Sequence, residues 1–218
     1  MRSASDPAQL YSAKGQTYLR FIGFFLYPQG IRAYFRASPL LRSGMRVLDA
    51  GCGTGVLTLA LREALLGREL TPGPLQGFDL SQSMIERFRD ALHSQEIEGV
   101  EVEQADVTGL GTLPDSWKGY DLIVSASMLE YVPPDRFVAA LGGLRALLRE
   151  EGTFLLFISR ESWLMRLLVG RPWQATLYEA AQLTSSLRQA GFSRIEFRKF
   201  PIRFRHLALW GHIVEARI

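Results

Sequence analysis

The sequence has one cysteine, Cys52, among its 218 residues, and only three histidines. An intramolecular disulfide is therefore excluded, and a zinc centre built from several cysteines is excluded with it. Long apolar runs are also missing. The longest early run, residues 21–27, is far shorter than the roughly 20 residues of a membrane-spanning helix. The first 16 residues lack the apolar stretch of a secretory signal. We expect a cytoplasmic protein without a bound metal.

The remaining composition is that of a globular protein with a sizeable core. Apolar residues make up 47% and charged residues 22% of the chain, which fits one domain with an N-terminal arm. The net charge is +3, and arginines are concentrated toward the two ends. This mild excess is compatible with an anionic partner or surface, but also with ordinary solvated side chains.

Strand-like and helix-like patterns alternate from Met45 onward. The predicted strands are residues 46–51, 75–81, 100–106, 120–127, 153–159, 193–200 and 206–218, and the predicted helices are residues 54–67, 82–95, 135–152 and 176–191. This alternation predicts an α/β fold with a doubly wound, mostly parallel sheet. Ligands of such sheets bind beyond the carboxyl ends of the strands.

The segment VLDAGCGTG, residues 47–55, predicts a strand that runs through a glycine turn into a helix. Gly51, Gly53 and Gly55 occupy every second position, whereas the dinucleotide-binding pattern requires its third glycine at the position of Val56. A phosphate-binding loop would need a lysine after Gly55, and none is present. We interpret the turn as backbone that lies against an adenosyl group. The following helix N-terminus then faces a carboxylate.

Two carboxylates follow the next two strands. Asp79 can accept two hydrogen bonds from a ribose diol, and Asp106 can accept one from an exocyclic amine. The backbone N–H of Val107 can serve a ring nitrogen, with Leu80 and Met84 as apolar contacts to a purine. The alternatives are that Asp79 or Ser81 caps the next helix and that Asp106 caps a turn. Cys52 is compatible with a small buried residue as well as a ligand contact.

Together, VLDAGCGTG, GFDLSQSMIERFR, EVEQADV and YDLIVSASMLEYVP resemble the successive motifs of class I S-adenosylmethionine-dependent methyltransferases. The resemblance covers roughly residues 45–218. It implies a Rossmann-like sheet of seven strands, with the last strand antiparallel between the fifth and sixth. It also implies S-adenosylmethionine as cofactor and S-adenosylhomocysteine as product.

The resemblance carries family roles onto individual residues. Asp49 is expected to orient the cofactor's amino group, the loop from Gly51 to Gly55 with Cys52 to hold the methionine end, and Ser125 to offer its carbonyl. Asp79 is expected at the ribose, and Asp106 with Val107 at the adenine. Tyr131 stands where many relatives have histidine, which puts any chemistry of that histidine in doubt here.

The methyl acceptor is expected to meet less regular segments. We divide the chain into a helical lid or arm, residues 1–44, and a methyltransferase domain, residues 45–218. Candidate acceptor and lid residues are Tyr11, Tyr18 and Trp163, and candidate catalytic residues are Glu130 and Tyr131.

The aromatic, arginine-rich arm and residues 160–175 suggest a small apolar or lipid-like acceptor and a possible peripheral membrane contact. The alternatives are an RNA or protein methyltransferase and an inactive cofactor-binding protein. Nucleic acid is not expected, because no N-P-P-Y-type motif and no long basic run are present.

Overall fold

A computed structural model describes residues 27–166, 170 and 175–218. The strands are β1 (Val47–Ala50), β2 (Leu75–Asp79), β3 (Val100–Gln104), β4 (Tyr120–Ala126), β5 (Leu148–Ser159), β6 (Arg194–Arg198) and β7 (Gly211–Arg217). The α-helices are α2 (Tyr27–Ala37), α3 (Val56–Leu66), α4 (Gln82–Ser94), α5 (Pro134–Leu147), α6 (Trp163–Met165) and α8 (Ala180–Gln189). Three 3-10 helices are η1 (Leu110–Thr112), η2 (Leu129–Tyr131) and η4 (Ile202–Leu209).

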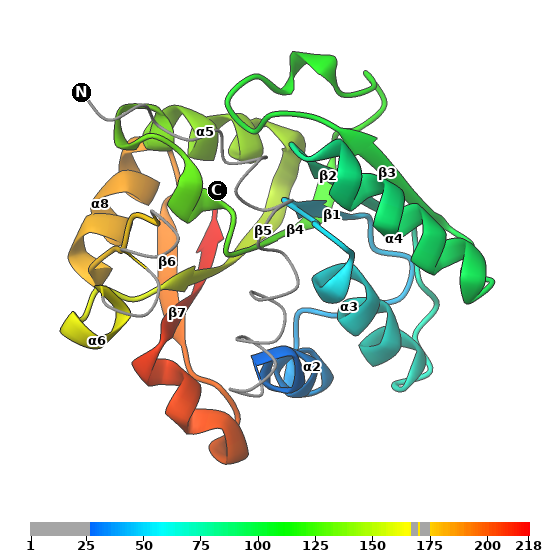
Figure 1. Cartoon of the computed structure of the whole chain (residues 1–218), viewed down its shortest axis with the longest axis horizontal. Helices are drawn as coiled ribbons and strands as arrows, with labels where there is room; N and C mark the ends of the chain where they lie inside the picture. The colour runs from blue at the N-terminus through cyan, green and yellow to red at the C-terminus, as the bar shows by residue number, and fades with distance from the viewer. Residues whose placement is uncertain (1–26, 167–169, 171–174) are drawn as a thin grey trace.

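The seven strands form one sheet in the order β3-β2-β1-β4-β5-β7-β6 (Figure 1). Strands β1 to β5 pair in parallel, and β7 pairs antiparallel with both β5 and β6. The predicted α/β fold and the antiparallel insertion of the last strand are therefore confirmed. Strand order reverses between β1 and β4, which places a ligand site at their carboxyl ends.

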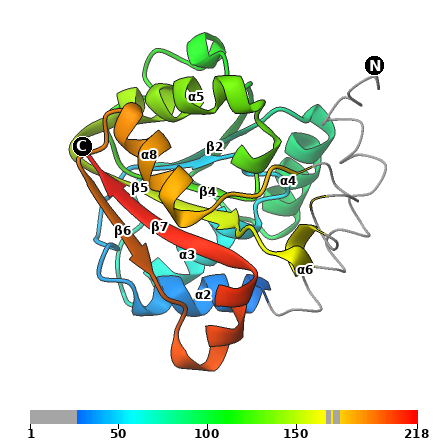
Figure 2. The ribbon, with the colours of Figure 1, turned by 90° about the vertical axis from the view of Figure 1, so that its left-hand side faces the viewer.

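Helices cover both faces of the sheet. On one face, α2 and α3 share a hydrophobic cluster with the inward side chains of β4 and β5, and on the other face α5 and α8 do the same (Figure 2). Ile31 and Phe35 of α2 are almost completely buried in the first cluster. The described part of the predicted arm therefore packs as a core helix. The division at residue 44 stays a prediction, because residues 1–26 lie outside the described part.

Three predicted boundaries are wrong. The helix predicted for residues 135–152 ends at Leu147, because β5 begins at Leu148 and passes through a bulge opposite Tyr120 before it reaches Thr153. Gly152 belongs to this bulge, where a Cβ would lie 2.8 Å from the Tyr120 carbonyl oxygen. Gly152 therefore does not end a helix.

The other two corrections concern the C-terminal third. The capping box of α8 is formed by Glu179 and Gln182, so the helix begins at Ala180 and not at residue 176 as predicted. Residues 206–209 continue η4 and do not start the last strand. Leu207 explains the difference, because its side chain is buried in the hydrophobic cluster with α2. A helical turn at this position allows that packing.

Candidate active site

The glycine turn connects β1 to α3 through left-handed backbone. Gly53 has φ +52°, and a Cβ built on it would have no atom of the described residues within 4 Å. Gly55 has φ +85°, and its Cβ would lie 2.1 Å from the Phe88 ring of α4. Gly55 therefore allows the two helices to approach closely, while Gly53 leaves open space above the backbone. An open, side-chain-free turn of this kind can lie against a flat ligand.

Asp49 lies beneath this turn and is almost completely buried. Its Oδ2 atom accepts a hydrogen bond of 2.6 Å from the Thr58 hydroxyl, whereas its buried Oδ1 atom has no hydrogen-bond partner in the described structure. Burial raises the pKa of Asp49 to about 7, and the nearby charge of Asp79 adds to this rise. An unpartnered buried acceptor is costly, so the site suits a ligand that donates a hydrogen bond or carries positive charge.

Asp79 connects the end of β2 to the glycine turn. Its Oδ2 atom accepts from the Gly53 N–H at 2.9 Å, and its Oδ1 atom accepts from the Ser81 N–H at 2.8 Å. Burial raises the pKa of Asp79, although both N–H groups favour the charged form. Each carboxylate oxygen can accept a further hydrogen bond, so Asp79 can bind a diol while it keeps its hydrogen bond to the turn. Ser81 is the N-cap of α4, but its side chain forms no capping bond.

The expected adenine contacts follow β2 and β3, which pair in parallel up to Asp79 and Gln104. Leu80 is 43% exposed, while Met84 and Val107 are buried. Asp106 is exposed, and its Oδ1 atom accepts from the Thr108 N–H at 2.8 Å. An exposed apolar side chain beside an exposed carboxylate fits a purine that stacks on one and donates to the other.

Cys52 and Ser125 support the turn from below. The Cys52 side chain packs with Phe88 and Ile85, and burial raises the pKa of its thiol. Only the backbone of Cys52 therefore remains for a ligand. The Ser125 hydroxyl donates to the Ala50 carbonyl oxygen at 2.8 Å and ties β4 to β1.

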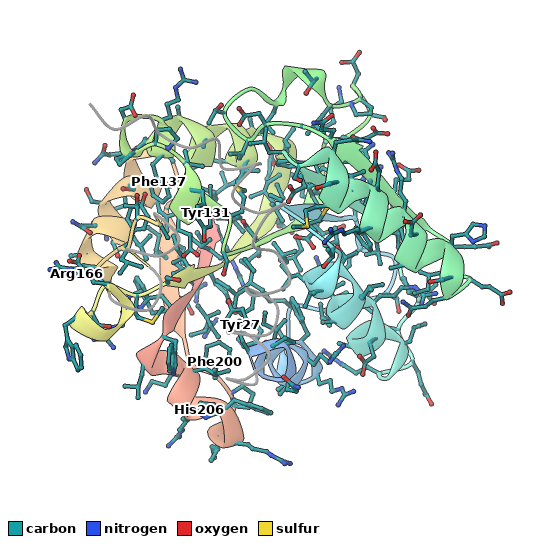
Figure 3. All side chains as sticks on the ribbon, in the orientation of Figure 1. Tyr27, Tyr131, Phe137, Arg166, Phe200 and His206 are labelled. Atoms are coloured by element: carbon teal, nitrogen blue, oxygen red, sulfur yellow. The ribbon has the colours of Figure 1, made fainter. Side chains whose placement is uncertain are left out.

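Glu130 and Tyr131 lie in η2, just after β4. Glu130 is buried, and its Oε2 atom accepts from the Ser159 N–H at 3.0 Å. Its backbone oxygen accepts from the Thr176 N–H at 2.8 Å. Burial raises the pKa of Glu130. Glu130 thus connects η2, the end of β5 and the segment before α8. In the view of Figure 3, Tyr131 lies nearer the centre of the molecule than Phe137 does.

Tyr178 is a polar group that the sequence did not single out. Its ring stacks on Phe137 with centroids 4.5 Å apart, and its hydroxyl is buried without a hydrogen-bond partner among the described residues. Burial, followed by the charge of Glu130, raises its pKa to about 12. Tyr178 and Glu130 therefore place two titratable groups on the same side of the strand ends.

The sequence analysis also predicted no role for Thr58 and Met128. Thr58 is buried on the inner side of α3, where the sequence pattern shows only a small residue between leucines. Met128 packs against Gly51, since a Cβ there would lie 2.4 Å from its side chain. Neither role has a signal in the sequence.

Of the predicted lid residues, Trp163 alone lies in the described part of the chain. Tyr11 and Tyr18 lie outside the described residues. Trp163 begins α6 and is 78% exposed. In Figure 1, α6 lies across the molecule from α3 and α4.

Within residues 27–166, 170 and 175–218, no group of three or more histidine, cysteine, aspartate or glutamate side chains could hold a metal ion. No helix in this part of the chain is long and apolar enough to cross a membrane.

A family model described as a methyltransferase domain matches residues 41–190. The chain therefore belongs to the methyltransferase-domain family, in the class I group that uses S-adenosylmethionine. A ubiquinone biosynthesis O-methyltransferase of Bordetella avium is 33% identical over 159 residues, which cover 68% of this chain. The match spans 62% of that relative's length.

Solved structures show the same fold. PigF with bound SAH superposes with a TM-score of 0.72 at 23% identity, over 98% of this chain and 60% of PigF. Magnesium protoporphyrin IX methyltransferase from Synechocystis PCC 6803, with bound SAM, gives a TM-score of 0.68 at 19% identity, over the full length of both chains. At these identities the likeness concerns the fold.

Proposed function

We propose that the protein transfers a methyl group from S-adenosylmethionine to a small, apolar or lipid-like acceptor. The observation that carries the proposal is the buried, unpartnered Oδ1 atom of Asp49 beneath the open turn at Gly53. A positively charged amino group would satisfy this oxygen, directly or through a water. The side-chain-free turn would accept the methionine end.

The remaining assignments follow the strand ends. Asp79 binds the ribose diol, Asp106 and the Val107 N–H bind the adenine edge, and Leu80 with Met84 contacts its faces. The Ser125 carbonyl is a further acceptor for the amino group. Bonds to a charged acceptor such as Asp79 are each worth about 1.5–3 kcal/mol, so this carboxylate is expected to dominate the adenosyl contacts.

The sulfonium supplies the methyl group when the cofactor is bound. The chain then has to align the acceptor atom with it and to exclude water. A general base is needed only where the acceptor atom carries a proton. Glu130 and Tyr131 are our candidates, because they follow β4 and because burial raises the pKa of Glu130, which makes its carboxylate a stronger base.

The acceptor class is supported by the relative from Bordetella avium, which is a ubiquinone biosynthesis O-methyltransferase. Tyr11, Tyr18 and Trp163 are proposed to contribute to the acceptor side, and the arm and residues 160–175 to a peripheral membrane contact. We propose a cytoplasmic enzyme that does not act on nucleic acid.

A transfer assay with tritiated S-adenosylmethionine tests the proposal. Cell extract is fractionated into lipid, small polar, protein and RNA pools, and label is expected in the lipid or apolar small-molecule pool. Label in RNA or protein would contradict the acceptor class. Calorimetric binding of S-adenosylmethionine without transfer to any pool would indicate an inactive binding protein, and binding of NADH instead would contradict the cofactor.

A further inference from the structure

The short helix η4 presents two large aliphatic side chains to solvent. Ile202 is 78% and Leu209 is 65% exposed, whereas Leu207 between them is buried against the cluster of α2. Phe200, just before η4, packs edge-on against Tyr27 with ring centroids 6.5 Å apart. The segment is thus fixed to the core at Phe200 and Leu207, while Ile202 and Leu209 on either side of a kink at Phe204 remain exposed. Single exposed aliphatics are common on protein surfaces, so the charges along the segment have to decide whether these two mark a contact surface.

The charged side chains of this segment all have one sign. Residues 197–214 contain no aspartate or glutamate, and Lys199, Arg203 and Arg205 are all exposed. Within the described residues, none of these three cations forms an ion pair. The contrast lies in α2, where Arg32 and Arg36 both pair with Glu63. The cations at η4 are therefore available for an external anion.

The position of η4 relates this surface to the strand ends. The Arg160 N–H donates to the Trp210 carbonyl oxygen at 3.0 Å, and Gly211 pairs with Ser159 at the carboxyl end of β5. The glycine turn lies at the same edge of the sheet, after β1. Figure 1 shows η4 in red-orange at the lower rim, and Figure 3 shows His206 farther out than Phe200.

We propose that η4 docks the protein on an anionic lipid bilayer. In this arrangement Ile202 and Leu209 enter the interface, and Lys199, Arg203 and Arg205 contact the headgroups. Charge complementarity selects this partner, because a second copy would bring the same cations together. Two aliphatic side chains and three cations give weak, reversible, salt-sensitive binding.

Docking through η4 turns the carboxyl edge of the sheet toward the bilayer. A lipid-like acceptor could then pass from the membrane to the strand ends. This consequence rests on the proposed function, whereas binding to vesicles is measured without any acceptor. Vesicle binding without methyl transfer would leave the docking surface standing and contradict only the proposed function.

The experiment is co-sedimentation of the full chain with vesicles. Binding is expected with phosphatidylcholine that contains phosphatidylglycerol, not with phosphatidylcholine alone, and it should be lost at high salt. The double variant Arg203→Glu and Arg205→Glu should weaken binding by about tenfold or more. Ile202→Ser with Leu209→Ser should weaken it severalfold, without affecting thermal unfolding, since both positions are exposed.

Matched controls separate the surface from net charge. Arg87→Glu with Arg188→Glu makes the same change of charge at exposed positions of α4 and α8, and Leu66→Ser removes a half-exposed aliphatic of α3. Both controls should bind like the original protein. The proposal is overturned if neutral vesicles bind equally well, if the controls bind as weakly as the η4 variants, or if the η4 variants bind unchanged. A dimer that the serine variants dissociate, without vesicle binding, would also overturn it.

Discussion

We propose that the carboxyl ends of β1 and β2 form the adenosyl half of the site and that the edge beyond β5 forms the acceptor half. The two halves are built differently. At β1 and β2 the site consists of backbone and two carboxylates, the buried Asp49 and the partly buried Asp79. Gly55 and Phe88 fix the two covering helices against one another. Beyond β5 the described edge carries exposed side chains instead, with Trp163 at 78% and Ile202 at 78%. The first half is compatible with one ligand geometry, whereas the second presents apolar surface to whatever approaches.

This difference corresponds to what each half has to recognise. A cofactor of fixed shape favours a pre-formed site, since ordering a loop on binding would reduce affinity. An apolar acceptor offers few directional groups, so its recognition depends on surface and enclosure. We therefore expect substitutions near β1 and β2 to affect cofactor binding, and changes beyond β5 or in the arm to affect transfer.

Removal of residues 1–26 is the sharpest way to test this division. We expect methyl transfer to be abolished, while S-adenosylmethionine still binds and the sheet stays folded, because the acceptor side loses its proposed lid. Calorimetry and a transfer assay measure the two properties separately. Full transfer by the shortened chain would exclude the arm from acceptor binding.

The end point of this truncation matters. A chain shortened by residues 1–36 also loses most of α2, including the buried Ile31 and Phe35. It should unfold more readily, since loss of each such side chain from a core costs about 2–5 kcal/mol. Equal stability of the two truncations would contradict the placement of α2 in the core.

Gly55→Val tests the packing of the adenosyl half. The new side chain would collide with Phe88 and would require a left-handed backbone, which together cost about 2–5 kcal/mol of unfolding free energy. Denaturation in urea measures the loss. Gly99→Val is the matched control, because Gly99 has φ +78° and a Cβ on it would have no atom of the described chain within 4 Å. A loss no larger than that of the control would show that the contact between α3 and α4 is not limiting.

The sequence predicted the fold well because its signals are local. VLDAGCGTG combines a buried strand, a glycine turn and a helix start within nine residues, and the alternation after it determines a parallel sheet. The wrong boundaries lie where contacts between residues far apart in the sequence determine the local structure. The bulge that places Gly152 in β5 depends on pairing with Tyr120, and η4 depends on Leu207 packing beneath α2.

Only those candidate site residues that lie near the end of a predicted strand could be predicted from the sequence. Asp49 and Asp79 follow from their positions after apolar runs, and the structure places both beside the glycine turn. The contact of Thr58 with Asp49 joins residues nine positions apart on different elements, and no periodic pattern marks it. Tyr178 reaches the surroundings of Glu130 from a segment far along the chain.

Asp79→Ala tests the main polar contact of the adenosyl half. The substitution removes the acceptor for the ribose diol and the bond to the Gly53 N–H, so the Kd for S-adenosylmethionine should rise at least about tenfold. Asp106→Ala is the comparison, and its effect should be smaller because this carboxylate is exposed and is proposed to accept one bond. An unchanged Kd for Asp79→Ala would remove Asp79 from the site.

The mildest test varies pH around the raised pKa of Asp49. Because the folded protein holds this proton more tightly than the unfolded chain, stability from Asp49 is highest at low pH and falls as pH rises from about 4 to about 7.

Cofactor binding should change in the opposite direction. A positively charged amino group prefers the ionised carboxylate, so affinity should increase roughly fivefold between pH 6 and pH 7. Calorimetry at the two pH values measures this change. Asp49→Asn keeps an acceptor for Thr58 but cannot ionise, so it should remove most of the dependence, with Asp79 responsible for any remainder because its pKa is also raised. An equally steep pH dependence in Asp49→Asn would show that another group governs the pH dependence of cofactor affinity. The selectivity of the adenosyl half for the cofactor would then depend on the glycine turn and Asp79.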